Sequence, residues 1–265
     1  VRADQWAGFE WGSLLFDSTS EYSSRFWRAF RNTFVNSLYG LCIGFPIPII
    51  LALLFSEIKS DGYRSFLQVC AYLPHFVSTV VVTTLLTMWC ANGTSVSPEG
   101  VIHKLLLALD MVEQDSTVLY YPRFFRPIYQ ISGVWEGAGY GMIVYLAAIA
   151  GINTELYDAA YMDGAGRWKR IWHITLPQIK PTVVTILVMN LGKILSISFE
   201  KPYLMANAVV RDEVQVISTY VYSVGLQAGR YDYAAAVGIF QSVVALVMVL
   251  TANWAAKKLG EEGIM

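Results

Sequence analysis

The sequence predicts an all-α integral membrane protein with five transmembrane helices, and two observations support this fold class. Hydrophobic residues make up 55% of the 265 residues and charged residues only 15%, whereas soluble domains carry roughly 25% charged residues. The apolar residues also gather in long blocks, and a helix needs about 20 mostly apolar residues to cross the ~30 Å hydrocarbon core of a membrane.

Five blocks are long enough to cross a membrane, at residues 35–55, 66–89, 128–150, 182–199 and 234–256. Pro46 and Pro48 interrupt the first block, and Pro74 interrupts the second. Such prolines are tolerated because neighbouring helices satisfy the carbonyl groups that they free. Trp89 and Trp254 lie at block ends, where amphipathic rings favour the membrane interface.

Composition also argues against several partners and cofactors. A net charge of −1 lacks the basic footprint that binding to nucleic acid requires. Cys42, Cys70 and Cys90 lie within or at the ends of apolar blocks, with neither metal-ligand spacing nor a disulfide framework. We expect all three cysteines to be buried as small hydrophobic side chains, and we expect no metal site and no cofactor on this chain.

A polar, charged island at residues 155–181 separates the third and fourth blocks. Asn153 or Thr154 can cap a short helix at its start. Glu155 and Asp158 would lie in the first turn of this helix, where the helix dipole favours anions. The pattern therefore predicts a short helix at the edge of the membrane.

The second half of the island combines small residues with turn formers. Ala159 and Ala160 present almost no side chain, so another protein could approach the backbone closely. Gly164 and Gly166 supply the dihedral freedom for a sharp reversal. Two interpretations follow: a helix that docks into a cleft of a partner, or an ordinary interfacial loop whose glycines only turn the chain.

Three short motifs occur in order within the island: Asp158-Ala159-Ala160, Asp163-Gly164-Ala165 and Ile174-Thr175-Leu176-Pro177. Their residue types and spacing resemble the EAA loop of binding-protein-dependent ABC importer permeases, whose pattern runs E-A-A, D-G-A and I-x-L-P. Asp158 departs from the pattern because it stands where the family usually has Glu. Weaker similarity to the sugar-importing branch lies in Arg31-Asn32-Thr33, Leu73-Pro74 and Glu155-Leu156-Tyr157-Asp158-Ala159-Ala160.

The resemblance implies an importer permease (MetI-like) bundle with a cytoplasmic coupling helix. The permease domain would be residues 32–256 with the EAA loop at 153–177, preceded by an extracytoplasmic polar and aromatic segment at 1–31 and followed by a cytoplasmic tail at 257–265. Six helices in the family form imply a further helix before residue 1. Coupling to an ATPase would fall on Glu155, Asp158, Ala159, Ala160, Asp163, Gly164 and Ala165.

The resemblance also implies partners. The sequence holds no Walker P-loop of the G-x-x-x-x-G-K-[ST] type, so this chain is not expected to be an enzyme. ATP and Mg²⁺ would be bound by two ATP-binding cassette subunits. A second permease subunit that forms a heterodimer with this one, an extracytoplasmic solute-binding protein and an oligosaccharide cargo complete the expected importer. It would work by alternating access as a multi-pass protein among the lipids of the bacterial cytoplasmic (inner) membrane.

Lysine and arginine residues are almost equally frequent on the two sides of the predicted bundle, so their distribution does not settle its orientation. The resemblance places the island in the cytoplasm. Residues 91–127 and 205–230 would then form the outer face, with a short helix at 101–111. Either they contact the binding protein, or they are plain connecting loops.

Two ionisable residues lie inside predicted spans, where such residues are costly and usually face the bundle interior or a wet cavity. Lys193 lies near the middle of the fourth block and Glu136 well inside the third. At about 100° per residue, Asn190, Lys193 and Glu200 fall within roughly an 80° arc of one helix face. These residues are therefore candidates for a substrate path.

Aromatic residues accompany Glu136 on its helix. Tyr140 shares a face with Glu136, and Trp135 and Tyr145 offer stacking surfaces for sugar rings. Lys193 indicates an acidic cargo such as a uronic acid oligomer, although a structural Lys193–Glu136 ion pair remains an alternative. The predicted path residues are Trp135, Glu136, Tyr140, Tyr145, Asn190, Lys193 and Glu200.

Two other classes of protein fit the sequence less well. An ion- or proton-coupled secondary transporter could use Glu136 and Lys193, but such folds usually have more spans and pseudo-symmetric halves. An intramembrane enzyme is disfavoured because His75, His103 and His173 lie far apart, with no H-E-x-x-H pair and no G-x-S-x-G elbow. The importer permease is the better prediction.

Overall fold

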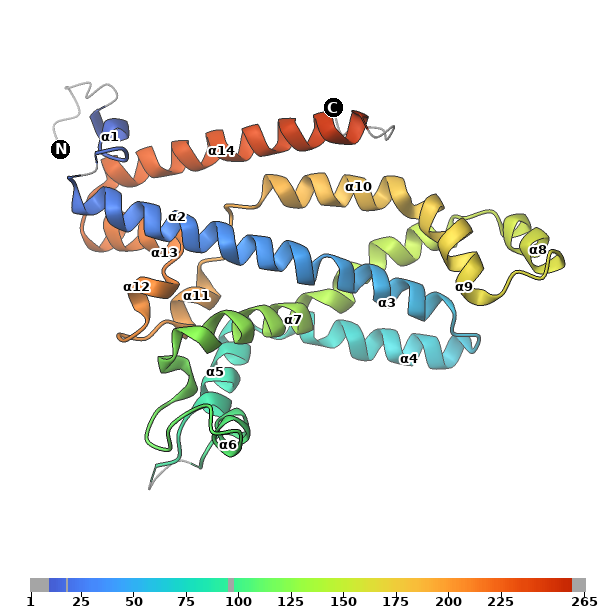
Figure 1. Cartoon of the computed structure of the whole chain (residues 1–265), viewed down its shortest axis with the longest axis horizontal. Coiled ribbons are helices and arrows are strands. Elements are labelled where there is room, and N and C mark those ends of the chain that lie inside the picture. Colours follow the sequence, from blue (N-terminus) through green and yellow to red (C-terminus); the bar gives the residue numbers. More distant parts are fainter. Residues whose placement is uncertain (1–9, 18, 95–97, 259–265) are drawn as a thin grey trace. The chain divides into compact units, whose positions relative to one another are not determined.

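The computed structural model describes residues 10–17, 19–94 and 98–258, and this part of the chain is helical without a β-strand (Figure 1). Among these residues, four helices are long and apolar enough to cross a membrane: Glu21–Ser56, Pro122–Ala150, Arg167–Gly192 and Tyr231–Lys258. A fifth span results if the broken pair Asp61–Phe76 and Thr79–Cys90 counts as one. The predicted all-α membrane fold is confirmed. The outer ends of the predicted N-terminal segment and tail, residues 1–9 and 259–265, lie outside the described residues.

The first span is longer than predicted. It joins α2 (Glu21–Tyr39), a π-helical turn η1 (Gly40–Gly44) and α3 (Pro46–Ser56), so it begins at Glu21 rather than at residue 35. The added turns are amphipathic, and their buried face carries Phe26 and Ala29. A polar sequence can form a helix if one of its faces is buried. A search for apolar blocks does not detect such a helix.

The second span, predicted at residues 66–89 with an interruption at Pro74, is broken into separate helices that begin at Asp61. It consists of α4 (Asp61–Tyr72), a 3₁₀ turn η2 (Leu73–Phe76) and α5 (Thr79–Cys90). Val77 and Ser78 between them have extended backbones, with ψ of 133° and 136°. Pro74 starts the disruption because its ring removes one backbone donor and clashes with the preceding turn.

The fourth span is shifted toward the N-terminus. It joins α9 (Arg167–Arg170), a π-helical turn η4 (Ile171–Thr175) and α10 (Leu176–Gly192), and is followed by a turn in which Ser196 N donates to Lys193 O at 2.8 Å. Lys193 therefore follows the helix instead of lying mid-span, which corrects the prediction. Gly192 and the turn end the helix, so Asn190, Lys193 and Glu200 do not share one helix face.

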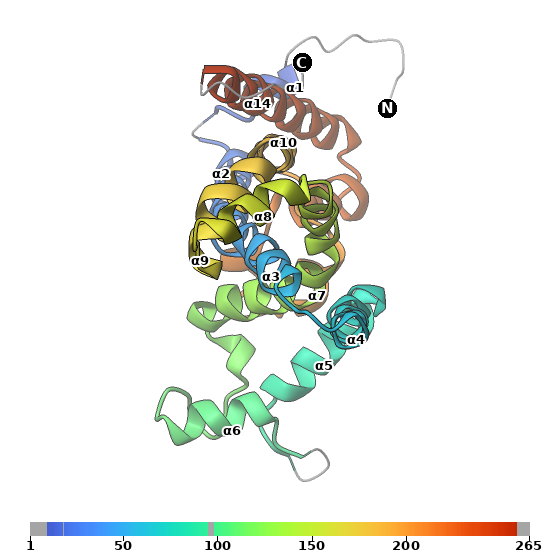
Figure 2. The ribbon, with the colours of Figure 1, turned by 90° about the vertical axis from the view of Figure 1, so that its right-hand side faces the viewer.

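The remaining elements are α1 (Glu10–Ser13), α6 (Val101–Ala108), η3 (Val118–Tyr120), α7 (Pro122–Ala150), α8 (Thr154–Met162), α11 (Glu200–Met205), α12 (Arg211–Val214), α13 (Ile217–Val221), η5 (Tyr222–Gln227) and α14 (Tyr231–Lys258). The predicted helix at 101–111 is present as α6, which ends at Ala108 shortly before Asp110 adopts a φ of 57°. Figures 1 and 2 both show α6 beside α5.

The chain folds as two units, each with its own core. The first comprises residues 1–38, 78–130 and 193–246, and the second comprises residues 39–77, 131–192 and 247–265. The first core gathers Cys90, Val112, Val118, Leu119, Phe125, Met205, Val210 and Val214. The second core gathers Ala52, Met142 and Tyr145.

The cysteines divide between core and surface. Cys90 is buried as predicted, but Cys42 and Cys70 are exposed, so the prediction of burial is wrong for those two. In a membrane protein an outward apolar face meets lipid tails that are as apolar as a protein interior. A small hydrophobic side chain is therefore accommodated there without protein contacts.

Candidate functional site

The polar island forms a capped helix. The Asn153 side-chain oxygen accepts a hydrogen bond from Glu155 N at 3.0 Å, at the start of α8. Asn153 Nδ2 also donates to Glu155 Oε2 at 3.1 Å. The predicted short helix is therefore present, with Asn153 rather than Thr154 as its cap. A cap of this kind is worth about 1 kcal/mol, which helps so short a helix to hold its shape.

A Schellman motif ends α8. Ala165 N donates to Ala160 O at 2.9 Å, and Gly164 N donates to Tyr161 O at 3.0 Å. Gly164 has a φ of +70°, which a residue with a side chain adopts only at a cost. Gly166 is extended, with φ −67° and ψ 168°, so only one of the two predicted glycines makes the reversal.

The coupling candidates gather on one outward-facing segment. α8, which is described in full, has no buried residue. Glu155, Asp158, Ala159, Asp163 and Gly164 are exposed, and Ala160 and Ala165 are partly exposed.

Apolar side chains that sequence reasoning missed lie on the same helix. Tyr161 is 71% exposed and Met162 is 85% exposed, and Leu156 is also exposed. The sequence did hold a signal for them, because these apolar residues lie between the acidic residues of the polar island. Such residues on a helix without buried positions are typical of a surface that contacts another protein.

One hydrogen bond attaches α8 to the span that follows it. The Tyr157 hydroxyl lies 2.9 Å from Thr175 Oγ1, and Thr175 is only 3% exposed in η4. Arg167 at the start of α9 also lies 3.8 Å from the Glu57 carboxylate. Movement of α8 can therefore reach α10 through η4, a π-helical turn of the kind often found at functional sites.

The predicted path residues fall into different environments. Trp135 and Tyr140 are exposed and Glu136 is half-buried on α7. Tyr145 is 2% exposed and packs with the second core, so its ring is not presented to a path.

The remaining three path candidates are exposed. Asn190 lies in the last turn of α10, Lys193 follows that helix, and Glu200 begins α11. Lys193 and Glu200 belong to the first unit, and Asn190 belongs to the second, as do residues 131–150 of α7. A transport role and a Lys193–Glu136 ion pair both stay predictions.

His75 adds an aromatic contact that sequence reasoning missed. Its ring stacks on Tyr140 with centroids 4.0 Å apart and planes at 8°, and Phe76 meets Tyr140 edge-on. Gly139 permits this approach of α4 to α7, because a Cβ there would collide with the Ala71 carbonyl. No periodic pattern marked His75, since it lies in the turn that breaks the second span.

Comparison with known proteins places the chain in a family. Residues 44–260 match the family described as binding-protein-dependent transport system inner membrane component. The chain belongs to this family. It is 38% identical over 260 residues to protein LplB of Bacillus subtilis, covering 98% of this chain and 78% of that protein. It is also 38% identical over 265 residues to the polygalacturonan/rhamnogalacturonan transport system permease protein YteP of the same organism, covering 100% and 78%.

Solved structures agree with this placement. A bacterial ABC transporter involved in the import of the acidic polysaccharide alginate contains a chain that is 44% identical, with a TM-score of 0.86 and coverage of 97% of this chain and 85% of that one. A second crystal structure shows a bacterial alginate ABC transporter in complex with an alginate pentasaccharide-bound periplasmic protein, with the same identity and TM-score.

These findings settle the class of protein. The chain is a membrane-embedded permease subunit of an ATP-driven ABC importer. It is not itself an enzyme, because ATP hydrolysis in this family belongs to partner subunits. The ion-coupled transporter is not favoured.

Proposed function

We propose that this permease carries an acidic oligosaccharide across the bacterial cytoplasmic (inner) membrane. Its partners would be two ATP-binding cassette subunits, a second and different permease subunit, and an extracytoplasmic solute-binding protein. Relatives support the cargo class, because one is named for polygalacturonan and another imports the acidic polysaccharide alginate. Polygalacturonan and alginate both carry carboxylates on their sugar rings.

The observation that carries the coupling role is the exposed, capped α8. A rigid helix with small residues and exposed apolar side chains fits a groove on an ATPase subunit. ATP binding would close the ATPase subunits and move α8 as a rigid body. The Tyr157–Thr175 contact would pass this movement to α10, and the bundle would shift between two access states.

This role implies a topology and a path. The loop that holds α8 and the tail after residue 256 would lie in the cytoplasm, with residues before 32 outside. Trp135, Glu136 and Tyr140 on α7 would line the substrate path together with Asn190, Lys193 and Glu200. Lys193 is exposed and would attract a carboxylate, and the aromatic rings would pack against sugar faces.

Purification from native membranes in mild detergent tests the coupling role. Gly164→Trp adds bulk and backbone strain to the docking surface, because Gly164 has a φ of +70°. We expect an ATPase subunit to co-purify with the native permease and to be lost with this variant.

Gly229→Trp is the matched control. Gly229 has a φ of +69°, and, as at Gly164, no described atom lies within 4 Å of a Cβ built there. This control should retain the ATPase. Retention of the ATPase by Gly164→Trp would contradict the coupling role. Loss of the ATPase from both variants would mean that tryptophan at either glycine disturbs folding.

A further inference from the structure

A pocket with both polar and apolar walls lies in the first unit, away from the coupling helix in the sequence. Its volume is about 320 Å³, and it is lined by residues of α11, α12, α13 and η5 and of the segments that join them. Binding sites for small ligands usually occupy about 300–1,000 Å³ and combine apolar or aromatic walls with a few polar groups. The pocket is therefore large enough for one unit of a larger ligand.

Tyrosine rings form one wall. The rings of Tyr203 and Tyr222 meet at 74° with centroids 5.4 Å apart, and Phe199 stacks on Tyr203 at 4.8 Å. Both tyrosines line the pocket. A flat aromatic face packs well against the C–H face of a pyranose ring, and the phenol hydroxyls can bond to sugar hydroxyls.

Polar side chains form part of the remaining lining, beside the apolar Pro202, Leu204, Ala206 and Val214. Arg211, Gln215, Ser223 and Gln227 all face the pocket. Amides and hydroxyls both donate and accept hydrogen bonds, as sugar hydroxyls do. The arginine guanidinium matches a carboxylate with two parallel hydrogen bonds. Arg211 is exposed, so its guanidinium is accessible to a ligand.

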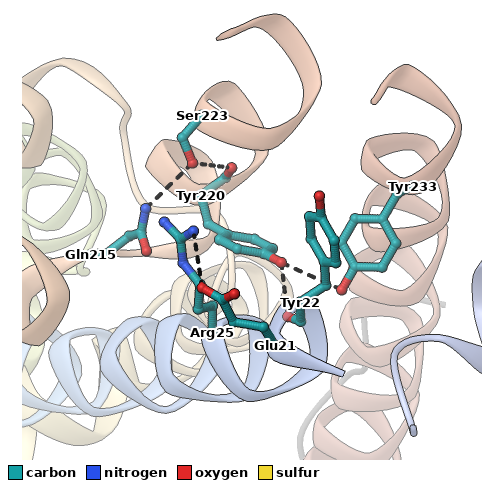
Figure 3. Close-up of polar contacts among 7 residues, drawn as sticks. All are labelled: Glu21, Tyr22, Arg25, Gln215, Tyr220, Ser223 and Tyr233. Carbon is teal, nitrogen blue, oxygen red and sulfur yellow. Dashed lines mark hydrogen bonds and ion pairs between the residues drawn. The ribbon is translucent and has the colours of Figure 1, made fainter. Parts of the chain in front are cut away.

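Hydrogen bonds to α2 hold this wall in place (Figure 3). Gln215 Nε2 lies 3.4 Å from Ser223 Oγ, which donates to Tyr220 O at 2.8 Å. The Tyr220 hydroxyl donates to Tyr22 O at 2.9 Å. Burial raises the pKa of Tyr220, so this hydroxyl stays protonated and keeps donating.

A second anchor is independent of Tyr220. Asn32 Nδ2 on α2 donates to Gln215 O at 3.1 Å. Two separate bonds from the pocket wall to a long helix leave the site largely formed before a ligand arrives. Preorganisation of this kind raises affinity because less ordering is needed on binding.

The position of the pocket in the chain indicates its side of the membrane. The span Arg167–Gly192 separates α8 from residues 193–230, so the two lie on opposite sides. This step rests on the proposed function, in which α8 faces the cytoplasm. The pocket then faces outward, where the binding protein delivers its cargo.

We propose that this pocket is an entry subsite that binds one uronate ring of the cargo, with Arg211 paired to its carboxylate and Tyr203 and Tyr222 against its ring. The carboxylate belongs to the sugar and not to an acidic side chain of the docked binding protein. A permease with this subsite would hold the released oligosaccharide at the outer mouth and would favour acidic over neutral chains.

Calorimetric titration of the purified importer complex in lipid nanodiscs, without binding protein, tests this proposal. The probes are trigalacturonate and its methyl ester, which keeps the rings but removes the charges. We expect the native complex to bind trigalacturonate and to bind the ester far more weakly. Arg211→Gln should weaken binding of trigalacturonate roughly ten- to hundred-fold, whereas Arg211→Lys should lose less.

Lys104→Gln is the matched control, since it removes one exposed positive charge from α6 in the same unit. The Lys104→Gln complex should bind trigalacturonate with the same affinity as the native complex. Equal affinity of the native and Arg211→Gln complexes would overturn the proposal. So would equal binding of the ester, or binding that appears only when binding protein is added.

Co-purification of the ATPase is measured on the same samples. If the ATPase is present and Arg211→Gln has no effect, the subsite fails and the permease role stands. If no ATPase accompanies the native chain, the proposed coupling role fails.

Discussion

At the scale of single residues, Tyr157 determines how α8 is held. Packing alone cannot fix this helix, because α8, described over its whole length, buries none of its residues. The Tyr157 hydroxyl reaches Thr175 at 2.9 Å, and Thr175 is buried. A hydrogen bond of this kind contributes about 1 kcal/mol, which is enough to favour one orientation of a short surface helix.

Tyr157→Phe should therefore uncouple the importer without dissociating it. The ring stays in place, and only the hydroxyl that meets Thr175 is lost. We expect the variant to assemble and hydrolyse ATP while the amount of substrate imported per ATP falls several-fold in proteoliposomes. Tyr161→Phe removes the same atom from an exposed side chain of the same helix and should keep the native ratio. A native ratio in Tyr157→Phe would show that this contact does not transmit movement.

Sequence reasoning found the motif residues but misplaced Lys193. Asn153 and Gly164 could be predicted because a cap and a left-handed turn depend on local chemistry. Lys193 could not be placed, because the end of its helix depends on tertiary contacts. Gln241 Nε2 donates to Leu195 O at 2.6 Å in the turn that follows. Sequence periodicity cannot predict a hydrogen bond between residues so far apart in the chain.

At the scale of elements, the apolar blocks predicted which helices exist but not where they start or break. Block length decides whether a segment can cross a membrane, and each predicted block overlaps a helix. α2 begins at Glu21 because an amphipathic face packs against protein. Pro74 marked an interruption of the second block, but the extended residues Val77 and Ser78 were not predicted because proline is often tolerated within membrane helices.

Close packing of α4 on α7 provides a test at this scale. Gly139→Ala would place a methyl group against the Ala71 carbonyl, and such overpacking costs about 1–3 kcal/mol. We expect a lower midpoint of thermal unfolding in detergent. Gly137→Ala is the control on the same helix, where no described atom lies within 4 Å of the added Cβ; its midpoint should be native or slightly higher. Equal midpoints for both variants would mean that α4 and α7 do not pack this closely.

At the scale of the whole molecule, two of the long apolar helices bury almost none of their most apolar residues. Only 6% of the most apolar window is buried in Glu21–Ser56, and the same holds in Tyr231–Lys258. An exposed apolar surface of this extent marks contact with lipid or with another protein. The family that residues 44–260 match explains contact with lipid and contact with protein, because an importer permease lies in a membrane beside other subunits.

The topology that this assembly needs can be tested with two single cysteines. Asp163 directly follows α8 and Ala228 directly follows η5, and one span, Arg167–Gly192, lies between them. We expect a membrane-impermeant maleimide to label Asp163→Cys only in inside-out vesicles and Ala228→Cys only in intact spheroplasts. The three native cysteines are replaced by serine so that Cys42 and Cys70, which are exposed, give no background. Labelling of both positions from the same side would show that Arg167–Gly192 does not cross the membrane, and it would remove the outward-facing position on which the proposed uronate subsite depends.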